Sequence, residues 1–409
     1  MGMLEAIKQQ KMERDRLLSR DYVEREILPA ARASVGNELI KVLVGPRRAG
    51  KSVLGLLMLK NLNFAYLNFD DEQLLKVTDY DQMITWCKTV YPGFEYLFLD
   101  EIQNLPSWEL WVNKLARRGY NLVITGSNAR LLDGELATHL TGRYQRIEVW
   151  PMSLKECQKI EPEMSLHDYL MTGGYPEVVV KKVEVNAYLQ TLFEATLLKD
   201  IVKRFHLRHT EEIYNLAKYL ISQFANMYSY RELARLNGIS VGSAQKYVEY
   251  LEQTYMFGSL PRFDFKYKKQ IGYNKKMYVV DTGMVAANAS QDSQNLGRLL
   301  ENMVLMEWVR RGKELGKNLF YYKTRNGREV DLVIKEDLKI VELIQVSWDT
   351  QDEKTWKREI AGLREAGKEL KCQKLTLLTM SKPTREIGDV EIRDVEEWMT
   401  GTDPFMTQM

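Results

Sequence analysis

The sequence predicts an α/β protein in which a parallel sheet covered by helices is followed by a helical region and a second α/β domain. Three observations predict this fold class. Apolar strand-like runs alternate with helical segments between Leu39 and Val149, apolar residues recur at helical spacing after Tyr188, and apolar residues alternate with polar ones from Glu329 onward. A chain of 409 residues is too long for one hydrophobic core, so we expect two to three globular domains.

The strand-like runs and the helical runs divide the chain into consecutive parts. The first part is an arm of charged, helix-forming residues. The predicted ranges are 1–30 for the arm, 31–160 for the first α/β core, 161–280 for the helical region and 281–409 for the second α/β domain. In the first core, the predicted strands are Leu39–Val44, Ala65–Phe69, Tyr96–Leu99, Leu122–Thr125 and Arg146–Val149.

Composition excludes several classes of protein. The net charge is +2 and 45% of the residues are apolar, so any surface for an acidic partner must be local. Cys87, Cys157 and Cys372 have no C-x-x-C spacing, which fits a reducing compartment better than a zinc site or a disulfide framework. No apolar run approaches the roughly 18 residues of a membrane span, and residues 1–20 lack the apolar segment of a signal peptide. We therefore expect a cytoplasmic protein without a membrane partner.

A phosphate-binding loop is predicted directly after the first strand. Residues 45–52 read G-x-x-x-x-G-K-S and lead into a helical run, Val53 to Leu59. Such a loop directs backbone N–H groups and the positive end of a helix at phosphate oxygens. The residues expected to contact the nucleotide are Gly45, Pro46, Arg47, Arg48, Ala49, Gly50, Lys51, Ser52 and Val53.

Within this loop, two residues have specific chemical roles. Lys51 is expected to reach the β- and γ-phosphates and Ser52 to hold Mg²⁺. For Arg47 and Arg48, contact with phosphate or with a neighbouring molecule and simple surface exposure both remain open. The motif itself does not separate ATP from GTP, but we find no Asn-Lys-x-Asp-like guanine signature.

The third predicted strand ends in two carboxylates. Its apolar residues lead directly into Asp100 and Glu101, as expected for a buried strand that ends at the ligand edge of a parallel sheet. Asp100 is expected to orient the water shell of Mg²⁺, and Glu101 to polarise the attacking water.

Three further residues are candidates for the same reaction. Asn128 follows the fourth strand and is placed to bond the attacking water or the γ-phosphate, although a plain Gly-Ser-Asn turn is the alternative. Arg130 and Arg143 are candidate catalytic arginines that act in the same chain or on a neighbouring subunit, and exposed surface arginines are the alternative.

Several segments together carry a resemblance to a known family. They are G-P-R-R-A-G-K-S at 45–52, L-D-E-I-Q at 99–103, T-G-S-N-A-R-L-L at 125–132, L-T-G-R-Y at 140–144, the segment 173–177, Asp281 with Gly283, and the segment 295–301. The chain resembles the prokaryotic AAA-like P-loop ATPases, found mainly in archaea and bacteria, in which the ATPase domain is fused to a C-terminal domain of unknown function. This resemblance implies ATP as the nucleotide and Mg²⁺ as its partner. Such ATPases often assemble into rings, so we expect a homo-oligomer.

A helix-turn-helix is predicted in the helical region. Tyr230 to Ser240 reads as a short helix, a turn at Asn237-Gly238 and a new N-cap, and Val241 to Leu251 reads as a second helix. A basic wing is predicted from the runs 266–270 and 274–276. The candidate DNA-contacting residues are Ser240, Ser243, Gln245, Lys246, Tyr247, Lys268 and Lys269. Many winged-helix modules bind protein or serve only as structure, so these alternatives remain open.

In the C-terminal domain, a helix carrying Glu301 precedes a strand with Asp331 and a second strand that ends in Gln345-Val346-Ser347. This order resembles the PD-(D/E)XK nuclease fold, and Gln345 and Ser347 stand where that family has the carboxylate and the lysine of E-x-K. Serine cannot supply the ammonium charge beside the attacking water, so we expect a degenerate site without nuclease activity. Glu301 and Glu342 would either complete a weak metal site or be surface carboxylates.

These observations predict an ATPase that acts on DNA through a winged-helix module and a degenerate nuclease-like domain. Branched or junction DNA, such as a Holliday junction, is one candidate substrate, by association with the predicted domains. Two other functions remain open: an ATP-dependent signalling or defence switch that binds a protein partner, and an ATP-gated, metal-dependent nuclease.

Overall fold

The computed structural model describes the whole chain except residues 1, 128–141, 290–295, 349–352, 381–387 and 402–409. The chain forms two compact units, each described by itself below. Unit 1 comprises Met1–Met152 with Gln253–Tyr255, and unit 2 comprises Ser153–Glu252 with Met256–Met409. Within the described ranges, every helix is too short or too polar to cross a bilayer.

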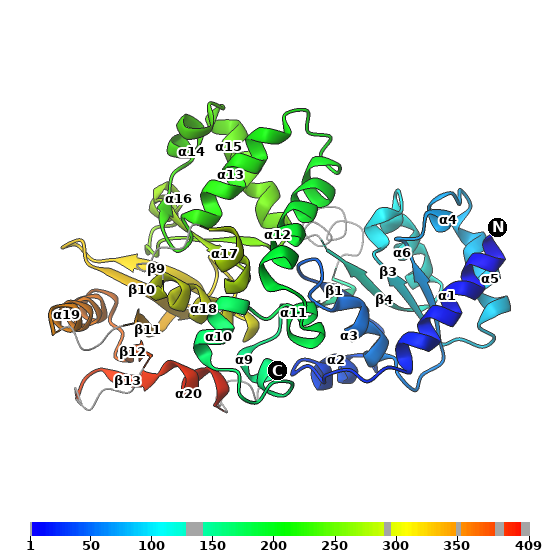
Figure 1. The fold of residues 1–409 in the computed structure, drawn as a ribbon, viewed down its shortest axis with the longest axis horizontal. Helices are drawn as coiled ribbons and strands as arrows, with labels where there is room; N and C mark the ends of the chain where they lie inside the picture. Colours follow the sequence, from blue (N-terminus) through cyan, green and yellow to red (C-terminus); the bar gives the residue numbers. More distant parts are fainter. Residues whose placement is uncertain (1, 128–141, 290–295, 349–352, 381–387, 402–409) are drawn as a thin grey trace. The chain divides into compact units, whose positions relative to one another are not determined.

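Unit 1 is built on a five-stranded sheet in which all neighbouring strands are parallel, in the order β2-β3-β4-β1-β5 (Figure 1). The strands are β1 (Ile40–Val44), β2 (Phe64–Asn68), β3 (Tyr96–Asp100), β4 (Asn121–Gly126) and β5 (Tyr144–Glu148). Each lies within two residues of its predicted position, which confirms the α/β prediction for this part of the chain. Continuous apolar runs predicted the strands well because both faces of this sheet are buried.

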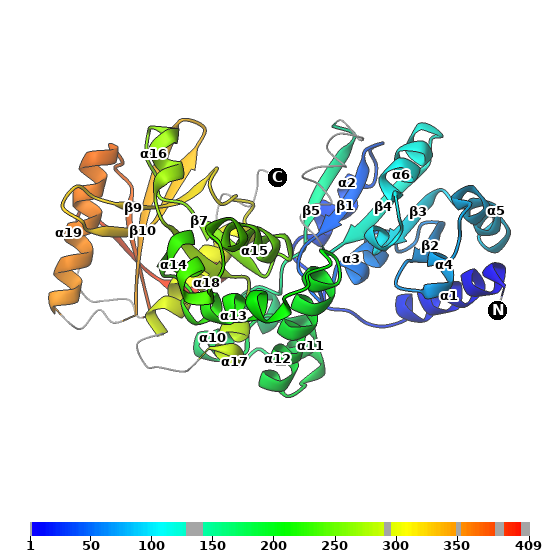
Figure 2. The same ribbon diagram turned by 90° about the horizontal axis from the view of Figure 1, so that it is seen from above.

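Helices cover both faces of the unit 1 sheet (Figure 2). Val42 and Val44 belong to one hydrophobic cluster and Leu43, between them, belongs to the other, because successive side chains of a strand point to opposite faces. The helices are α1 (Met3–Leu18), α2 (Leu28–Ser34), α3 (Lys51–Met58), α4 (Glu72–Leu75), α5 (Tyr80–Val90), the 3₁₀-helix η1 (Ile102–Asn104) and α6 (Trp108–Arg117). Helices α2 and α3 pack on one face, and α1, α5 and α6 pack on the other.

The loop between β1 and α3 is held closely against the end of β5. Gly45 has a φ of 143°, and a Cβ atom at this position would lie 2.1 Å from the carbonyl oxygen of Val149. Only glycine allows this conformation and this close approach. The loop therefore begins at the carboxyl edge of the sheet, where β3 and β4 also end.

The first part of unit 2 is helical, as predicted. Its helices are α9 (Leu154–Gln158), α10 (Leu166–Thr172), α11 (Pro176–Lys181), α12 (Val185–Thr196), the π-helix η2 (Leu197–Val202), α13 (Thr210–Ser222), α14 (Tyr230–Asn237), α15 (Val241–Gln253), α16 (Tyr267–Gly272) and α17 (Thr282–Asn288). The apolar residues that recur at helical spacing along α12, η2 and α15 are buried, namely Leu189, Leu192, Phe193, Leu197, Ile201, Ala244, Val248 and Leu251.

A small antiparallel sheet with the order β6-β8-β7 accompanies these helices. Its strands are β6 (Met227–Tyr228), β7 (Phe257–Leu260) and β8 (Lys275–Val279). Directly after β8, the buried Asp281 accepts a 2.7 Å hydrogen bond from the backbone N–H of Gly174. A Cβ atom on Gly173 would lie 1.9 Å from the same carboxylate, which explains why a glycine occurs at position 173.

The second sheet of unit 2 has the order β13-β12-β11-β10-β9. Its strands are β9 (Leu319–Lys323), β10 (Glu329–Glu336), β11 (Lys339–Ser347), β12 (Leu375–Thr379) and β13 (Glu391–Asp394). The pairs β9–β10 and β10–β11 are antiparallel, and β11–β12 and β12–β13 are parallel. Helix α18 (Leu296–Arg310) precedes this sheet, α19 (Glu353–Leu370) packs on β10, β11 and β12, and α20 (Val395–Thr400) follows β13.

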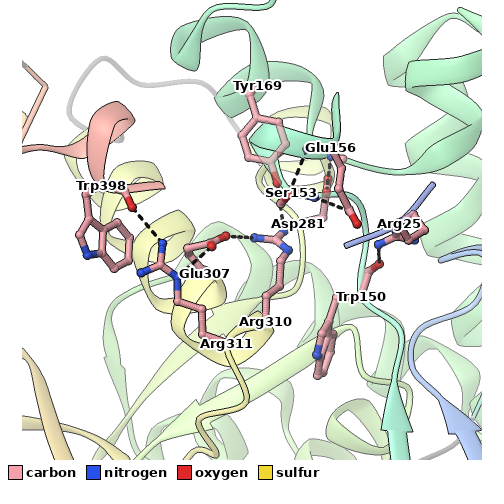
Figure 3. Close-up of polar contacts among 11 residues, drawn as sticks. Arg25, Trp150, Ser153, Glu156, Tyr169, Asp281, Glu307, Arg310, Arg311 and Trp398 are labelled. Carbon is pink, nitrogen blue, oxygen red and sulfur yellow. Dashed lines mark hydrogen bonds and ion pairs between the residues drawn. The ribbon is translucent and has the colours of Figure 1, made fainter. Parts of the chain in front are cut away.

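Two adjacent arginines at the end of α18 connect it to other helices of unit 2 (Figure 3). Arg310 donates to the hydroxyl of Tyr169 on α10 (3.0 Å), and Arg311 donates to the backbone carbonyl of Trp398 on α20 (2.9 Å). Glu307 lies between them and pairs with both guanidinium groups, at 3.4 and 3.1 Å. A buried charge network of this kind is stabilising only when each charge is paired, as it is here.

Candidate active site

The phosphate-loop motif folds as predicted, between the end of β1 and the start of α3. Lys51 is the first residue of α3, and its ammonium group donates to the backbone carbonyls of Gly45 (3.1 Å) and Pro46 (2.9 Å). Its side chain is therefore folded onto the loop that it follows. The first turn of a helix presents backbone N–H groups that lack helical partners, which favours an anion at this position.

Asp100, the last residue of β3, is surrounded by hydroxyl groups from three other elements. Ser52 on α3 donates to its Oδ1 (2.9 Å), Tyr66 on β2 donates to its Oδ2 (3.0 Å), and Thr125 on β4 also donates to Oδ1. Asp100 is 2% exposed, so its orientation is set by these three contacts. The parallel sheet brings these residues together because β3 and β4 end at the same edge.

Burial favours the neutral, protonated form of both Asp100 and its hydrogen-bond donor Tyr66. Burial, and then the neighbouring charge of Glu101, raise the pKa of Asp100 to about 6, although the hydrogen bonds from Thr125, Ser52 and Tyr66 oppose this rise. Burial and the charge of Asp100 also raise the pKa of Tyr66, so its phenol remains a hydrogen-bond donor. A nearby cation would stabilise the ionised carboxylate.

Glu101 follows β3 and has a positive φ of 51°, a backbone conformation that non-glycine residues seldom adopt. Its backbone N–H donates to the hydroxyl of Thr125 (2.9 Å), and its carboxylate accepts a hydrogen bond from the side chain of Gln103. Thr125 therefore contacts both acidic residues that the sequence predicted. Strained backbone of this kind is frequent at functional sites, where the surrounding contacts maintain it.

The chemistry and spacing of Ser52 and Asp100 fit a magnesium ion. Mg²⁺ prefers oxygen ligands in an octahedron, with bonds of about 2.1 Å, so neighbouring ligands lie about 3 Å apart. The hydroxyl of Ser52 and the nearer carboxylate oxygen of Asp100 are separated by 2.9 Å. Both atoms are hard oxygen donors, so they suit direct ligation or contact with the water shell of the ion.

Sequence reasoning missed three residues at or near this site. Arg25, which precedes α2, donates to the loop carbonyl of Ala49 (3.1 Å) and to the carbonyl of Trp150 (2.7 Å; Figure 3). Tyr66 contacts Asp100, as described above. Ser127 lies two residues beyond Thr125 and is 2% exposed, and its hydroxyl has no hydrogen-bond partner among the described residues. Of these three residues, only Ser127 could have been predicted from the sequence, because it directly follows an apolar strand.

Three candidate catalytic residues follow β4, and one of them, Arg143, lies in the part of the chain that the structure describes. Asn128 and Arg130 lie outside the described residues. Arg143 is exposed and immediately precedes β5, where its carbonyl accepts a hydrogen bond from the N–H of Ile40 at the start of β1. Arg143 thus lies beside the first residue of β1, whereas the phosphate-binding loop follows the last residue of that strand. The length of β1, about 16 Å, therefore separates the backbone of Arg143 from the loop. This separation argues against a catalytic role of Arg143 within its own chain, and its role at the site stays a prediction.

The predicted DNA-contacting residues are mostly accessible. Ser240, Gln245, Lys246, Lys268 and Lys269 are exposed, and Ser243 is half-buried. Ser240 accepts a 3.0 Å hydrogen bond from the N–H of Ser243 and begins α15 as the predicted cap. Tyr247, which we also expected to face DNA, is instead buried and donates to Glu212 (2.8 Å).

The expectation that Lys276 lies on a basic wing is wrong. Lys276 is 4% exposed, and its ammonium group lies 2.7 Å from Glu301, 2.5 Å from Glu329 and 3.7 Å from Asp331. The phenol of Tyr278, two residues further along β8, donates to Glu301 (2.5 Å). Burial, and then the charge of Glu301, raise the pKa of Asp331 well above its usual range.

The fold brings together three of the four residues predicted for the degenerate nuclease-like site. Glu301 and Asp331 share the ammonium of Lys276, and Gln345 accepts a 3.3 Å hydrogen bond from the N–H of Asp331. Ser347 is buried at the end of β11, on the same face of the strand as Gln345.

Glu342 lies on the opposite face of β11 from Gln345. It pairs there with Lys374 (3.0 Å) and Thr376 (2.6 Å). A metal site built from Glu301 and Glu342 is therefore wrong. In the described ranges, no group of three or more His, Cys, Asp or Glu side chains is arranged to hold a metal ion.

Comparison with protein families gives three consecutive matches. Residues 37–158 match an AAA domain, residues 163–295 match a domain of unknown function (DUF8612), and residues 296–397 match another (DUF4143). The five-stranded parallel sheet with its phosphate loop agrees with the first match. The matches to the other two describe no activity.

Similar proteins occur in archaea and bacteria. An uncharacterized protein of Methanocaldococcus jannaschii is 33% identical over 389 residues, which cover 87% of this chain and 85% of that protein. An uncharacterized protein of Haemophilus influenzae is 27% identical over 391 residues, or 88% of this chain and 94% of that protein. Among solved structures, a Walker-type ATPase of Pyrococcus abyssi is 12% identical, with a TM-score of 0.46 over 65% of this chain and 96% of that chain.

Proposed function

We propose that this chain, which carries an AAA domain and belongs to one family with an uncharacterized protein of Methanocaldococcus jannaschii, hydrolyses ATP with Mg²⁺ and couples this reaction to DNA. The observation that carries the first part is the contact of Thr125 with both acidic residues, Asp100 and Glu101. Ser52 and Lys51 complete this arrangement from the adjoining loop and helix.

The residues of the site have separate tasks in the proposed reaction. The loop N–H groups and the Lys51 ammonium bind the β- and γ-phosphates, while Ser52 and Asp100 hold Mg²⁺ or its water shell. An ion held by Ser52 and Asp100 would supply positive charge against the negative charge that develops on the phosphates. Glu101 orients the attacking water and accepts its proton as the new oxygen–phosphorus bond forms and ADP leaves.

Two substitutions test this assignment. Lys51→Ala should abolish measurable nucleotide binding or turnover, because it removes the charge that contacts both phosphates. Glu101→Gln should bind ATP but lower kcat by about two to three orders of magnitude, since the amide cannot accept the proton. Glu109→Gln, an acid-to-amide change at a half-buried position on α6, is the matched control. Undiminished turnover in both site variants would refute the assignment.

The proposal of a DNA partner rests on unit 2. The order α13–β6–α14–α15–β7–α16–β8, with a three-stranded antiparallel sheet, supports the proposal of a winged helix. The turn between α14 and α15 contains Gly238 in a left-handed conformation. Ser240, Gln245 and Lys246 are exposed around the start of α15, where such modules contact the major groove.

A second surface supports nucleic acid as the partner. We define the aromatic–basic strip as residues 265–271, which lie within the connection between β7 and β8. Phe265 and Tyr267 are each 74% exposed, Ile271 is 65% exposed, and Lys266, Lys268 and Lys269 lie between them. Aromatic side chains that stack on bases, next to cations that contact phosphates, are typical of surfaces that bind unpaired nucleic acid. Branched DNA is therefore a candidate substrate, because it offers both duplex and unpaired bases.

A single set of assays tests the DNA partner. The ATPase rate of the full chain is measured with duplex, single-stranded and four-way DNA over a range of salt concentrations. Stimulation that is strongest with branched or unpaired DNA supports the proposal. The absence of any response at low salt, where phosphate contacts are strongest, would contradict it and favour the alternative of a switch that binds a protein partner.

Assembly is a further part of the proposal. We propose a homo-oligomer in which an arginine of one copy, Arg130 or Arg143, serves the site of its neighbour. Arg143 is exposed and remote from the site of its own chain, as such a role requires. The specific activity should then rise with protein concentration, and Arg143→Ala should remove this rise without weakening ATP binding.

A further inference from the structure

We propose that Lys276 is a built-in cation: its ammonium group fills the carboxylate cluster of the C-terminal domain in the manner of a metal ion and joins β8 to α18 and β10. This inference does not depend on the ATPase proposal, since it concerns residues that the nucleotide reaction does not use.

The carboxylates of the cluster could bind a cation, and the ammonium group of Lys276 already occupies the position of that cation. Three carboxylates from two elements, Glu301 on α18 and both Glu329 and Asp331 on β10, converge on one ammonium group. The ring of Tyr321 on β9 adds a cation–π contact, with its centroid 5.8 Å from the Lys276 ammonium. Lysine side chains are seldom buried unless they are paired in this way.

The backbone fixes Lys276 in this position. Lys276 lies opposite Met227 of β6 and Leu260 of β7, so its strand is paired on both sides. Three residues further on, the fully buried side chain of Asn302 accepts from the N–H of Val279 (2.9 Å) and donates to its carbonyl (2.7 Å). The backbone that carries Lys276 therefore cannot move away from the cluster without loss of these contacts.

A divalent ion and the Lys276 ammonium therefore compete for the same carboxylates. The lysine is covalently attached and positioned by three strands and a helix, so it has the advantage of a very high local concentration. The cluster should not take up Mg²⁺ or Mn²⁺ in the unmodified chain, and this domain should not cleave DNA. Its role is then structural: it holds the β6–β8–β7 sheet against α18 and the second sheet of unit 2.

The test uses the full chain without nucleotide, with Mn²⁺ as the probe and thermal unfolding and electron paramagnetic resonance as readouts. Lys276→Met should lower the Tm by roughly 5–10 °C, because it leaves buried carboxylates without a cation. Lys275→Met removes the same charge from the neighbouring, less buried position on β8 and is the matched control, with a shift of less than about 2 °C. The unmodified chain should bind no Mn²⁺ that depends on Asp331.

A second variant keeps the test informative if Lys276→Met unfolds the domain. In the double variant Lys276→Met with Asp331→Asn, one carboxylate is neutralised together with the cation, so part of the lost stability should return. Three results would overturn the inference: Mn²⁺ bound by the unmodified chain and lost in Asp331→Asn, DNA cleavage that depends on Asp331, or a Lys276→Met variant as stable as Lys275→Met. The first two would instead support a metal-dependent nuclease.

Discussion

The hydroxyl of Thr125 accepts a 2.9 Å hydrogen bond from the backbone N–H of Glu101 and at the same time donates to the carboxylate of Asp100. One side chain on β4 thereby sets the orientation of a metal-binding candidate and the backbone of a catalytic candidate. Glu101 has a positive φ, so its position depends on contacts such as this one.

Thr125→Val should lower kcat by about 10- to 100-fold, while the chain remains folded. Valine preserves the shape of the side chain but removes both hydrogen bonds, each of which contributes about 1–2 kcal/mol when it involves a charged or strained group. Steady-state ATP hydrolysis measures this effect. Thr89→Val, on the exposed side of α5, removes a hydroxyl far from the site and should leave kcat unchanged. A Thr125→Val variant with normal kcat would show that Glu101 does not depend on this contact.

Tyr66→Phe should raise the Mg²⁺ concentration needed for half-maximal activity by about 3- to 10-fold. The phenol stabilises the ionised form of Asp100, so its removal should raise the pKa of Asp100 further and weaken metal binding. Tyr91→Phe is the matched control, since the Tyr91 phenol donates to the backbone carbonyl of Tyr66 and not to Asp100. Equal effects of the two substitutions would indicate a loss of packing rather than a role at the metal.

Asp100→Asn should stabilise the nucleotide-free chain above about pH 6 and have little effect near pH 4. The folded pKa of Asp100 is about 6, above the unfolded value of 3.8, so the folded state holds the proton more tightly. Stability from this group is therefore present at low pH and is lost as the pH rises from about 4 to about 6, by about 3 kcal/mol in total. Urea denaturation of both proteins across this range measures the difference. A difference that does not change with pH would contradict the raised pKa.

Strands β1 to β4 of unit 1 could be predicted from sequence because each is a mainly apolar run that is largely buried on both faces. Strand β5 is more polar and is mostly half-buried. The loop, Asp100 and Glu101 could be predicted because their spacing along the chain is fixed by the chemistry of phosphate binding. Tyr66 and Arg25 could not, because their roles arise from contacts with residues 34 and 24 positions away, and nothing local to either residue indicates them.

Lys276 illustrates a different limit of sequence reasoning. Two consecutive lysines in a polar turn normally indicate a solvated surface. Lys275 is partly exposed, in agreement with this pattern, but Lys276 is buried. The pattern Lys276-Met277-Tyr278-Val279 is also that of a strand, but the sequence does not show that three carboxylates will lie opposite its first residue. Buried polar networks are specified by tertiary contacts, so a local pattern cannot predict them.

Lys268→Ala combined with Lys269→Ala should reduce the slope of log affinity for single-stranded DNA against log salt concentration by roughly 1.4, since each phosphate contact contributes about 0.7 to this slope. Both lysines are exposed on the aromatic–basic strip. Fluorescence anisotropy with single-stranded DNA at several salt concentrations measures the slope. Lys317→Ala with Lys357→Ala removes two exposed lysines elsewhere in unit 2 and should not change it. Identical slopes for the two double variants would place the DNA contact elsewhere.

Asn302→Asp should destabilise unit 2 in a way that depends on pH, because Asn302 is fully buried and uses both its amide oxygen and its amide nitrogen on the backbone of Val279. An ionised aspartate can still accept from the Val279 N–H, but it cannot donate to the Val279 carbonyl, and it adds a buried charge beside Glu301. We expect a loss of about 2–4 kcal/mol at neutral pH.

The sign of the pH dependence distinguishes this mechanism from simple loss of packing. Burial should raise the pKa of the new carboxyl above its unfolded value of about 3.9, so the folded state binds the proton more tightly. The protonated acid can donate to the Val279 carbonyl again, so stability should return as the pH falls toward the unfolded pKa and be lost as the pH rises through the folded pKa. Asn302→Leu, which cannot titrate, should show the same loss at every pH relative to the unmodified chain. Urea denaturation of Asn302→Asp and Asn302→Leu, from neutral pH down to the unfolded pKa, measures the free energy of unfolding of each variant. If this free energy changed with pH in the same way for both variants, the proposed role of the contact between Asn302 and β8 would be excluded.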